Sequence, residues 1–315
     1  MKQLFAIDLH DYDGCTRVFR RPSARAIIVR EGRIALVYST KEKYYKFPGG
    51  GIRGDEHKKS ALIREVREEV GLTVIPGSIA GFGSVLRRQR SDHSPDTVFE
   101  QENFYYVCRV EDTIAEQNLD DYEREAGFVL RYADLDEAIR VNGAFTSPDG
   151  FDEIMIRREW RVLQLIRDTM IRERLLPHAY LMRVFPEGES IYAKEYAAAL
   201  EELLEKYPGN RLLWELESVS GAQESAAFIL GHCDGAMVSP DDFGRTFTRL
   251  LRPIYERADV SSFAARMYEL WQVFPEGIRN DEPFIRLCFA GDPLASGGGE
   301  ARTREILERF LTYYD

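Results

Sequence analysis

The sequence has 315 residues, of which 44% are hydrophobic and 30% charged, and its formal net charge at pH 7 is −11. This length and composition predict a folded chain with one large or two ordinary domains. The acidic balance excludes a protein that coats nucleic acid, because such binding depends on attraction to phosphates. A small anionic ligand is still compatible, since a metal ion or a few arginines reverse the charge locally.

The cysteines indicate where the protein works. Cys15, Cys108, Cys233 and Cys288 are far apart in the sequence, and none belongs to a CxxC motif. They therefore predict neither a zinc site nor a disulfide framework, and they favour a reducing compartment. No apolar run approaches the roughly 20 residues of a membrane-spanning helix, and the acidic N-terminus does not resemble a signal peptide. We expect a cytoplasmic protein without membrane attachment.

The first half of the sequence mixes β-rich runs with helical patterns. Runs rich in β-branched and aromatic residues predict strands within residues 25–40, 82–90, 98–110 and 128–135. The first of these runs is interrupted by Glu31-Gly32, which predicts a hairpin. Apolar spacing near 3.6 residues predicts helices at residues 56–70 and 152–171. This order predicts an α/β fold with helices packed on a sheet.

The second half of the sequence is mostly helical in pattern. Helices are expected at residues 194–210, 242–258, 261–274 and 301–314, with a shorter one at 224–232. We therefore expect two domains, an α/β domain over residues 1–172 and a helical domain of unknown function over residues 176–315.

Three glutamates crowd into five positions near the end of the helix predicted at 56–70. Glu65, Glu68 and Glu69 fall within an arc of about 100° on that helix, beside its apolar stripe. Hard divalent cations such as Mg²⁺ prefer oxygen ligands of this type. The glycines at 49–51, just before the helix, allow the backbone to approach a ligand closely. The pattern predicts a cation site rather than an ordinary solvated helix face.

The same stretch resembles the Nudix box, G-x5-E-x7-R-E-U-x-E-E-x-G-U, in which U is aliphatic. Every defined position of the box matches, namely Gly50, Glu56, Arg64, Glu65, Val66, Glu68, Glu69, Gly71 and Leu72. The preceding Phe47-Pro48-Gly49 is similar to the usual lead-in of the family. The chain resembles the MutT-like members of the family. This resemblance covers about residues 1–172 and does not extend to the second half of the sequence.

This resemblance implies an α/β/α sandwich with a mixed sheet. It also implies a hydrolase that uses Mg²⁺ or Mn²⁺ to cleave a phosphoanhydride bond in a nucleoside diphosphate linked to another group. Carried over by position, Glu65, Glu68, Glu69 and the carbonyl of Gly49 would bind the metal. Such chemistry needs the phosphate charge neutralised and a water molecule activated, and divalent metals supply both.

The remaining box residues have supporting roles by the same carry-over. Arg64 would orient a box glutamate through an ion pair and thereby belong to the catalytic set. Gly50, Glu56 and Gly71 would maintain the structure of the box.

A fourth acid often joins the site from a later loop, without a fixed motif. We expect this acid to be Glu125, just before the strand predicted at 128–135. Glu123, Glu100 and Glu102 are the alternatives, because sequence does not show which carboxylate reaches the attacking water.

Candidate substrate contacts lie before and after the box. Tyr45 and Phe47 are expected to stack on a nucleobase, although such aromatic residues more often pack on the sheet. Arg25 and Arg87 are expected to contact phosphates.

The sequence narrows the substrate only to a small-molecule nucleotide. The proline that marks ADP-ribose pyrophosphatases about fifteen positions after the box is replaced here by arginine. Nucleoside triphosphates are therefore favoured, and small ADP-ribose derivatives stay open. The alternative function is a nucleotide or ADP-ribose sensor whose helical domain binds a partner. The sequence also leaves a homodimer open.

Overall fold

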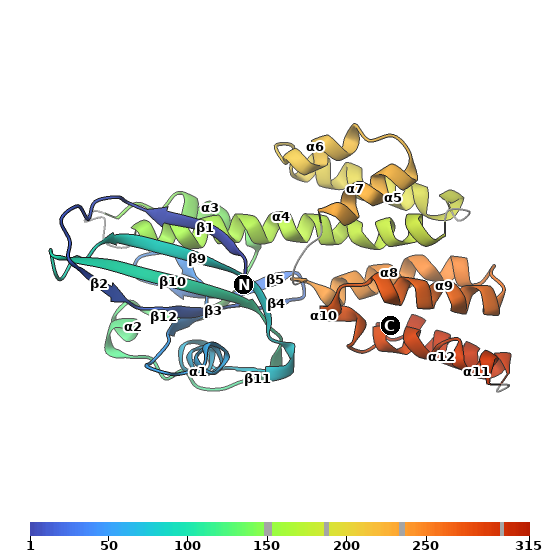
Figure 1. Ribbon diagram of the computed structural model, residues 1–315, viewed down its shortest axis with the longest axis horizontal. Coiled ribbons are helices and arrows are strands. Elements are labelled where there is room, and N and C mark those ends of the chain that lie inside the picture. The colour runs from blue at the N-terminus through green and yellow to red at the C-terminus, as the bar shows by residue number, and fades with distance from the viewer. Residues whose placement is uncertain (148–152, 186–188, 233–236, 297–298) are drawn as a thin grey trace. The chain divides into compact units, whose positions relative to one another are not determined.

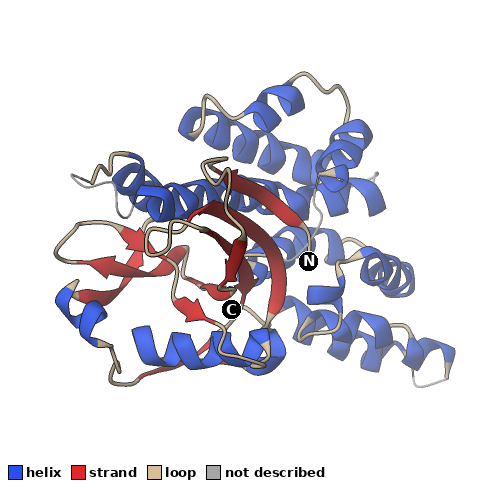
Figure 2. Cartoon of the chain, turned by 60° about the vertical axis from the view of Figure 1, so that its left-hand side comes forward, coloured by secondary structure: helices blue, strands red, loops and turns tan. Residues whose placement is uncertain are grey.

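The computed structural model describes residues 1–147, 153–185, 189–232, 237–296 and 299–315. This part of the chain divides into two compact units, Met1–Arg167 and Asp168–Asp315. Strands are confined to the first unit, and the regular elements of the second are all helical (Figure 2). Within these described ranges, no helix is both long and apolar enough to cross a lipid bilayer.

The first unit begins with strands and ends in a long helix. Its strands are β1 (Gln3–Asp8), β2 (Arg17–Arg20), β3 (Ser23–Ile27), β4 (Val29–Arg30), β5 (Arg33–Ser39), β6 (Tyr45–Lys46), β7 (Gly49–Gly51), β8 (Leu72–Val74), β9 (Ala80–Arg90), β10 (Thr97–Val107), β11 (Val110–Ile114) and β12 (Phe128–Ala133). Its helices are α1 (Lys58–Val70), α2 (Asp121–Glu125), α3 (Leu135–Gly143) and the first part of α4 (Glu153–Val184).

A mixed, six-stranded sheet forms the centre of this unit. Its strand order is β1-β9-β10-β3-β7, and β2 also pairs with β10. Strand β10 runs antiparallel to β9 but parallel to β2 and β3. Strands β12, β5, β4 and β6 form a second sheet. Helix α1 lies on one side of the strands and helices α3 and α4 lie on the other (Figure 1). The predicted α/β/α sandwich with a mixed sheet is therefore confirmed.

The predicted hairpin within residues 25–40 is formed by β4 and β5. Val29 pairs with Ile34, and the turn residues Glu31 and Gly32 have φ values of 51° and 71°. Positive φ at both central positions is the geometry of the tight turns that match the twist of a hairpin. Glycine adopts it without strain, which explains why this local signal could be read from the sequence.

Helix α1 has defined ends and one buried face. The side chain of His57 accepts from the backbone N of Lys59 at the start, and Gly71, at φ 71°, donates its N–H to the carbonyl of Arg67 at the end. A Cβ on Gly71 would lie 2.0 Å from the carbonyl oxygen of Ala115, so only glycine fits there. The residues that anchor the helix in the core are fully buried, namely Leu62, Val66 and Val70. Each contributes roughly 1.5–3 kcal/mol of stability.

Helix α4 is longer than the sequence predicted. A helix over residues 152–171 was expected, but the helix runs from Glu153 to Val184 and passes through Pro177, while residue 152 lies outside the described residues. A proline inside a helix removes one hydrogen bond and usually bends or ends it. Here the buried residues Leu176 and Tyr180 continue the apolar face beyond it. Tertiary packing therefore outweighs the local stop signal.

The second unit is helical, as predicted. After the end of α4, its elements are α5 (Glu189–Lys206), α6 (Arg211–Glu217), α7 (Ala222–Gly231), α8 (Pro240–Tyr255), α9 (Val260–Val273), α10 (Glu276–Arg279), the 3₁₀ segment Phe284–Phe289, α11 (Asp292–Ala295) and α12 (Glu300–Leu311). Phenylalanines from several of these helices meet in its core, where the rings of Phe243 and Phe247 are stacked at 5.5 Å.

A buried carboxylate holds the start of α8. Glu173, on α4, accepts hydrogen bonds from the backbone N of Val238 at 2.6 Å and of Ser239 at 2.8 Å. Burial raises the pKa of Glu173 to about 7. These two N–H groups lie just before the first residue of α8, and the buried carboxylate satisfies them.

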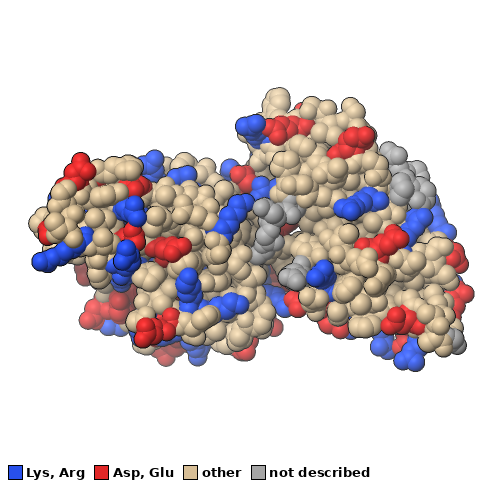
Figure 3. Space-filling model, in the orientation of Figure 1, with Lys and Arg blue, Asp and Glu red and all other residues tan. Residues whose placement is uncertain are grey.

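Charges of both signs are interspersed over the face shown in Figure 3. Many of the exposed pairs are short-range contacts along helices, such as Arg211 with Glu215 and Arg304 with Glu300. Exposed pairs of this kind contribute little to stability.

Candidate active site

Glu69 is the buried centre of the candidate site. It lies in the last turn of α1, and its side chain is only 3% exposed. Its Oε1 lies 2.7 Å from Nζ of Lys46, and its Oε2 accepts a hydrogen bond of 2.8 Å from the backbone N of Gly49. Both partners come from the segment that carries β6 and β7. A buried carboxylate is stable only when it is paired in this way.

Arg64 organises the other carboxylates of the box. Its guanidinium forms two hydrogen bonds to Glu56, at 2.9 and 2.8 Å, and further bonds to Glu65 at 2.6 Å and Glu68 at 3.2 Å. It also donates to the carbonyl of Gly51. The paired bonds from Arg64 lower the pKa of Glu56 to about 2. Because the guanidinium is a rigid fork, this arrangement fixes the geometry of the box as well as its charge.

Residues Gly49–Gly51 form a glycine loop that allows the carboxylate of Glu65 to approach the backbone. A Cβ on Gly50 would lie 2.2 Å from Oε2 of Glu65, and a Cβ on Gly49 would lie 2.1 Å from the carbonyl oxygen of Ala24. Gly49 also has φ 133°, which other residues rarely adopt. Burial raises the pKa of Glu65 and the charge of Glu69 adds to the rise, against the opposing effect of Arg64. Negative charge is therefore crowded at the loop.

The structure brings Glu123 to the site in place of the expected Glu125. Burial raises the pKa of Glu123 to about 7, and the charge of Glu69 and a hydrogen bond with it add to this shift. The Glu125 side chain is 77% exposed and lies 3.6 Å from Nζ of Lys41. Both acids belong to the short helix α2, but only Glu123 interacts with the buried carboxylate.

The other alternative acids have different surroundings. Glu100 is held by Arg88 at 2.7 Å and Arg20 at 2.9 Å, and these partners lower its pKa. Glu102 is exposed on β10. Among the described residues, neither carboxylate forms an ion pair or hydrogen bond that reaches the box glutamates.

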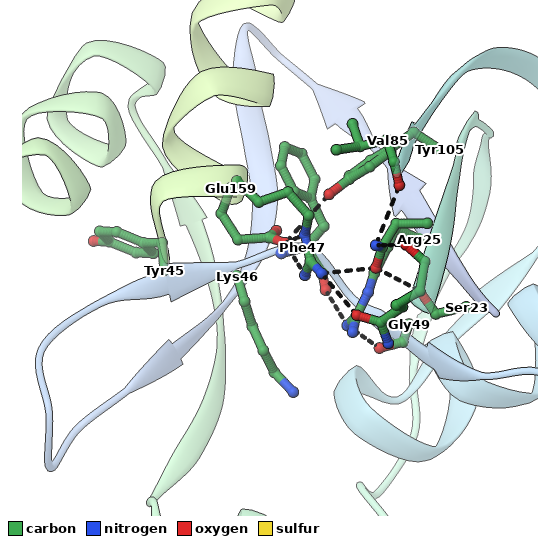
Figure 4. A network of polar contacts seen from close by, with 12 residues as sticks. Ser23, Arg25, Tyr45, Lys46, Phe47, Gly49, Val85, Tyr105 and Glu159 are labelled. Carbon is green, nitrogen blue, oxygen red and sulfur yellow. Dashed lines mark hydrogen bonds and ion pairs between the residues drawn. The ribbon is translucent and has the colours of Figure 1, made fainter. Parts of the chain in front are cut away.

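Tyr45 and Phe47 do not fit the predicted stacking role. The Tyr45 ring lies 4.9 Å from that of Tyr38, and the side chain points away from Lys46 (Figure 4). Phe47 is fully buried and packs edge-on against Tyr105 at 5.4 Å. Neither ring has a face free to receive a nucleobase, so the structure corrects this expectation in favour of core packing.

Arg25 lies beside the glycine loop, where its buried guanidinium supports the backbone. Its Nη1 donates to the carbonyls of Phe47 and Gly49. Its Nε is buried without a hydrogen-bond partner among the described residues. The charge of Arg25 also reaches Glu65, whose pKa it lowers slightly against the dominant effect of burial.

Arg87 does not share a face of the sheet with α1. In the register of β9 and β10 it pairs with Gln101, and its guanidinium lies 5.4 Å from the ring of Phe99. Gln101 contacts Arg158 of α4. Because side chains alternate along a strand, Arg87 faces the α4 side and Arg88 faces the α1 side. The predicted phosphate contact by Arg87 is therefore not supported.

Two buried charges behind the loop were not anticipated. Glu159 accepts from the backbone N of Phe47 at 2.9 Å and from Nε of Arg158 at 2.9 Å, and Tyr105 donates to it at 3.3 Å (Figure 4). Arg158 also donates to Asn103 at 2.7 Å. The spacing of Glu159 from the apolar positions of α4 placed it on the buried face, which was the signal available in the sequence.

Lys46 was also missed, although its position was suggestive. It immediately precedes the Phe-Pro-Gly lead-in of the box, and a charged side chain there faces the carboxylates once the loop folds onto α1. The buried pair that it forms with Glu69 depends on tertiary structure, which the spacing of residues does not reveal.

The oxygen atoms of the site are of the chemical type that binds a hard divalent cation. Carboxylate and carbonyl oxygens are the ligands that Mg²⁺ prefers. In the described part of the chain, however, no three acidic, histidine or cysteine side chains surround one point. Each predicted ligand has a cationic partner instead: Glu69 has Lys46, Glu65 and Glu68 share Arg64, and the Gly49 carbonyl has Arg25. Binding of an ion therefore requires some of these contacts to open.

Known proteins resemble short segments of this chain. The RNA pyrophosphohydrolase of Halorhodospira halophila is 37% identical over 68 residues, which are 21% of this chain and 36% of that protein. The CTP pyrophosphohydrolase of Escherichia coli is 39% identical over 56 residues, 16% of this chain and 42% of that protein. The chain thus spans less than half the length of these relatives.

Solved structures also resemble part of the chain. A NUDIX hydrolase from Nitrosomonas europaea has 18% identity and a TM-score of 0.32, and the match covers 44% of this chain and 89% of that one. A MutT protein from Bacillus halodurans has 15% identity and a TM-score of 0.29, with 44% and 80% covered.

A family model matches one part of the chain. A sequence model of the NUDIX domain matches residues 19–150, a range that holds the whole box, the glycine loop and α2. Strand β1 and helix α4 lie outside this range. The match to the NUDIX domain in this chain therefore covers residues 19–150.

Proposed function

We propose that this chain is a metal-dependent pyrophosphohydrolase that cleaves a phosphoanhydride bond in a nucleoside diphosphate linked to another group. The observation that carries the proposal is the buried carboxylate of Glu69, which accepts a hydrogen bond from the glycine loop and interacts electrostatically with Glu65 and Glu123. Such crowded negative charge is built to be offset by cations. The RNA and CTP pyrophosphohydrolases that share segments with the chain support the same class of reaction.

The proposed metal ligands are Glu65, Glu68, Glu69 and the carbonyl of Gly49. A divalent ion held there would neutralise phosphate charge and lower the pKa of a water molecule. Arg64 keeps the carboxylates of Glu65 and Glu68 in place, so these side chains lose little freedom on binding. The backbone N of Gly49 fixes the rotation of the Glu69 carboxylate in the same way.

Glu123 is the proposed general base. A carboxylate with a pKa of about 7 binds a proton near neutral pH far more readily than an ordinary glutamate. Above that pH it is ionised and able to accept the proton of the attacking water. Its side chain also accepts from the backbone N of Asp120 at 3.0 Å in a capping box, which restricts its rotation.

Replacing Glu123 separates the two candidate acids. We expect Glu123→Gln to lower kcat about tenfold and to remove the loss of activity below about pH 7, because the base is gone. The matched control is Glu125→Gln, two residues away on the same helix, which should stay within about twofold of wild type. Steady-state rates from pH 5.5 to 8.5 provide the measurement. If the two variants have equal rates, Glu123 is not the general base.

The proposed reaction is tested with a substrate panel. Purified full-length protein is incubated with Mg²⁺ or Mn²⁺ and with CTP, other nucleoside triphosphates, ADP-ribose or a 5′-triphosphorylated RNA. We expect turnover of at least one nucleotide, abolished by EDTA and restored by excess metal. If no compound is turned over but one raises the melting temperature, the sensor function is correct and the hydrolase proposal fails.

A further inference from the structure

Lys46 places a buried ammonium group inside the proposed metal site. Its side chain is 8% exposed, and its Nζ lies 2.7 Å from Oε1 of Glu69 and 4.1 Å from the ring centroid of Phe128. Lysine is rarely buried unless it is paired. The charge of Lys46 also acts on Glu123. One cation thus already serves the carboxylate on which metal binding depends.

The backbone on both sides of Lys46 is anchored. The N–H of Tyr45 donates to the side chain of Asn142 at 2.9 Å, and the N–H of Phe47 donates to Glu159 at 2.9 Å. In Figure 4 the Lys46 side chain extends away from both neighbouring rings. The lysine therefore cannot leave the site by a shift of the chain, and only rotation of its own side chain moves the ammonium.

We propose that Lys46 is a resident cation that competes with free divalent metal for Glu69, so that metal enters this site mainly as its complex with the nucleotide phosphates. The proposal rests on the proposed function, because it takes Glu69 as a metal ligand. It adds the order in which metal and substrate arrive.

The charges of the site explain this order. Lys46 already neutralises Glu69, and Arg64 supplies one further positive charge that Glu56, Glu65 and Glu68 share. A bare divalent ion would add two positive charges within a few ångströms of an ammonium group that has little water to screen it. A metal ion bound to a diphosphate carries no excess positive charge, so it enters without that repulsion. The phosphate oxygens would also provide the ammonium with a new partner once it leaves Oε1 of Glu69.

Binding of Mn²⁺ without nucleotide tests the proposal directly. Free Mn²⁺ is measured by electron paramagnetic resonance during titration of the full chain, for wild type, Lys46→Met and Lys46→Gln. We expect the dissociation constant to fall at least about tenfold in both variants, a change of about 1.4 kcal/mol. The control is Lys41→Gln, which removes the same charge from an exposed lysine that pairs with the exposed Glu125. It should stay within about twofold of wild type.

A purely structural role for Lys46 gives the opposite result. Glu69 would then lose the one counter-ion that it has among the described residues, and the site would bind Mn²⁺ equally or more weakly, which overturns the proposal. Should Lys46→Met fail to fold, Lys46→Gln decides, because its amide still donates to Glu69. If the Lys46 variants bind Mn²⁺ as tightly as wild type does, and wild type shows metal-dependent turnover, then Lys46 does not compete with metal. The proposed hydrolase function would still stand. If wild type neither binds Mn²⁺ nor turns over a nucleotide, both the Lys46 proposal and the proposed hydrolase function are rejected.

Discussion

Glu69→Gln is expected to lower turnover of every substrate at least about a hundredfold, because it removes the charge on which metal-assisted chemistry depends. The amide of glutamine still accepts one hydrogen bond from the backbone N of Gly49, so the loop keeps its anchor. What is lost is one negative charge at a buried position of the proposed metal site. The rate is measured at saturating nucleotide with Mg²⁺, and Mn²⁺ affinity is measured on the same samples.

A variant remote from the site provides the control for this experiment. Glu111→Gln makes the same change on the exposed strand β11 and should leave the rate within about twofold of wild type. The melting temperature of Glu69→Gln must also be compared with wild type, because Lys46 loses its partner in this variant. A folded Glu69→Gln protein with nearly normal activity would disprove the assignment of the site.

Arg158→Leu is expected to destabilise the first unit by about 3–5 kcal/mol, since it leaves the carboxylate of Glu159 buried without its counter-ion. Both side chains are at most 1% exposed, and Arg158 also donates to Gln101 and Asn103 of β10. Removing it therefore breaks several hydrogen bonds at once. Urea unfolding, followed by circular dichroism and by tryptophan fluorescence, measures the change.

The neighbouring Arg157 supplies a matched comparison. It is exposed one position earlier on α4, so Arg157→Leu should change stability by no more than about 0.5 kcal/mol. If the two leucine variants unfold at the same urea concentration, the buried pair of Arg158 and Glu159 contributes nothing to the free energy of unfolding. Catalytic rates for Arg158→Leu below its unfolding transition show whether the loop also depends on the pair.

The parts of the fold that could be predicted are those with local causes. The hairpin at Glu31-Gly32 follows from backbone preferences, and α1 follows from a 3.6-residue apolar period and a terminal glycine. Strands β1 and β2 could not be predicted, because the side chains of β2 are exposed, those of β1 range from exposed to buried, and both strands form by pairing with β9 and β10. Helix α4 continues past Pro177 for a similar reason, since its apolar face is buried on both sides of the proline.

The site shows the same division between local and tertiary causes. The spacing of the box places Glu65, Glu68 and Glu69 on one helix, and the structure keeps them there. Spacing does not reveal that Lys46 pairs with Glu69. Nor does it distinguish Glu123 from Glu125, since two positions on a helix differ by about 200° and only packing decides which faces inward.

The short segment that joins β6 to β7 has a fixed length. Within four residues, the side chain of Lys46 and the N–H of Gly49 bind α1 while the N–H of Phe47 binds α4. Connections between strands usually accept insertions, because their backbone faces solvent. Here one added or deleted residue would turn the lysine toward α4 and uncouple both helices from the loop. We therefore expect this segment to accept substitutions but no change of length, because its backbone and its lysine bind helices on both sides of the sheet.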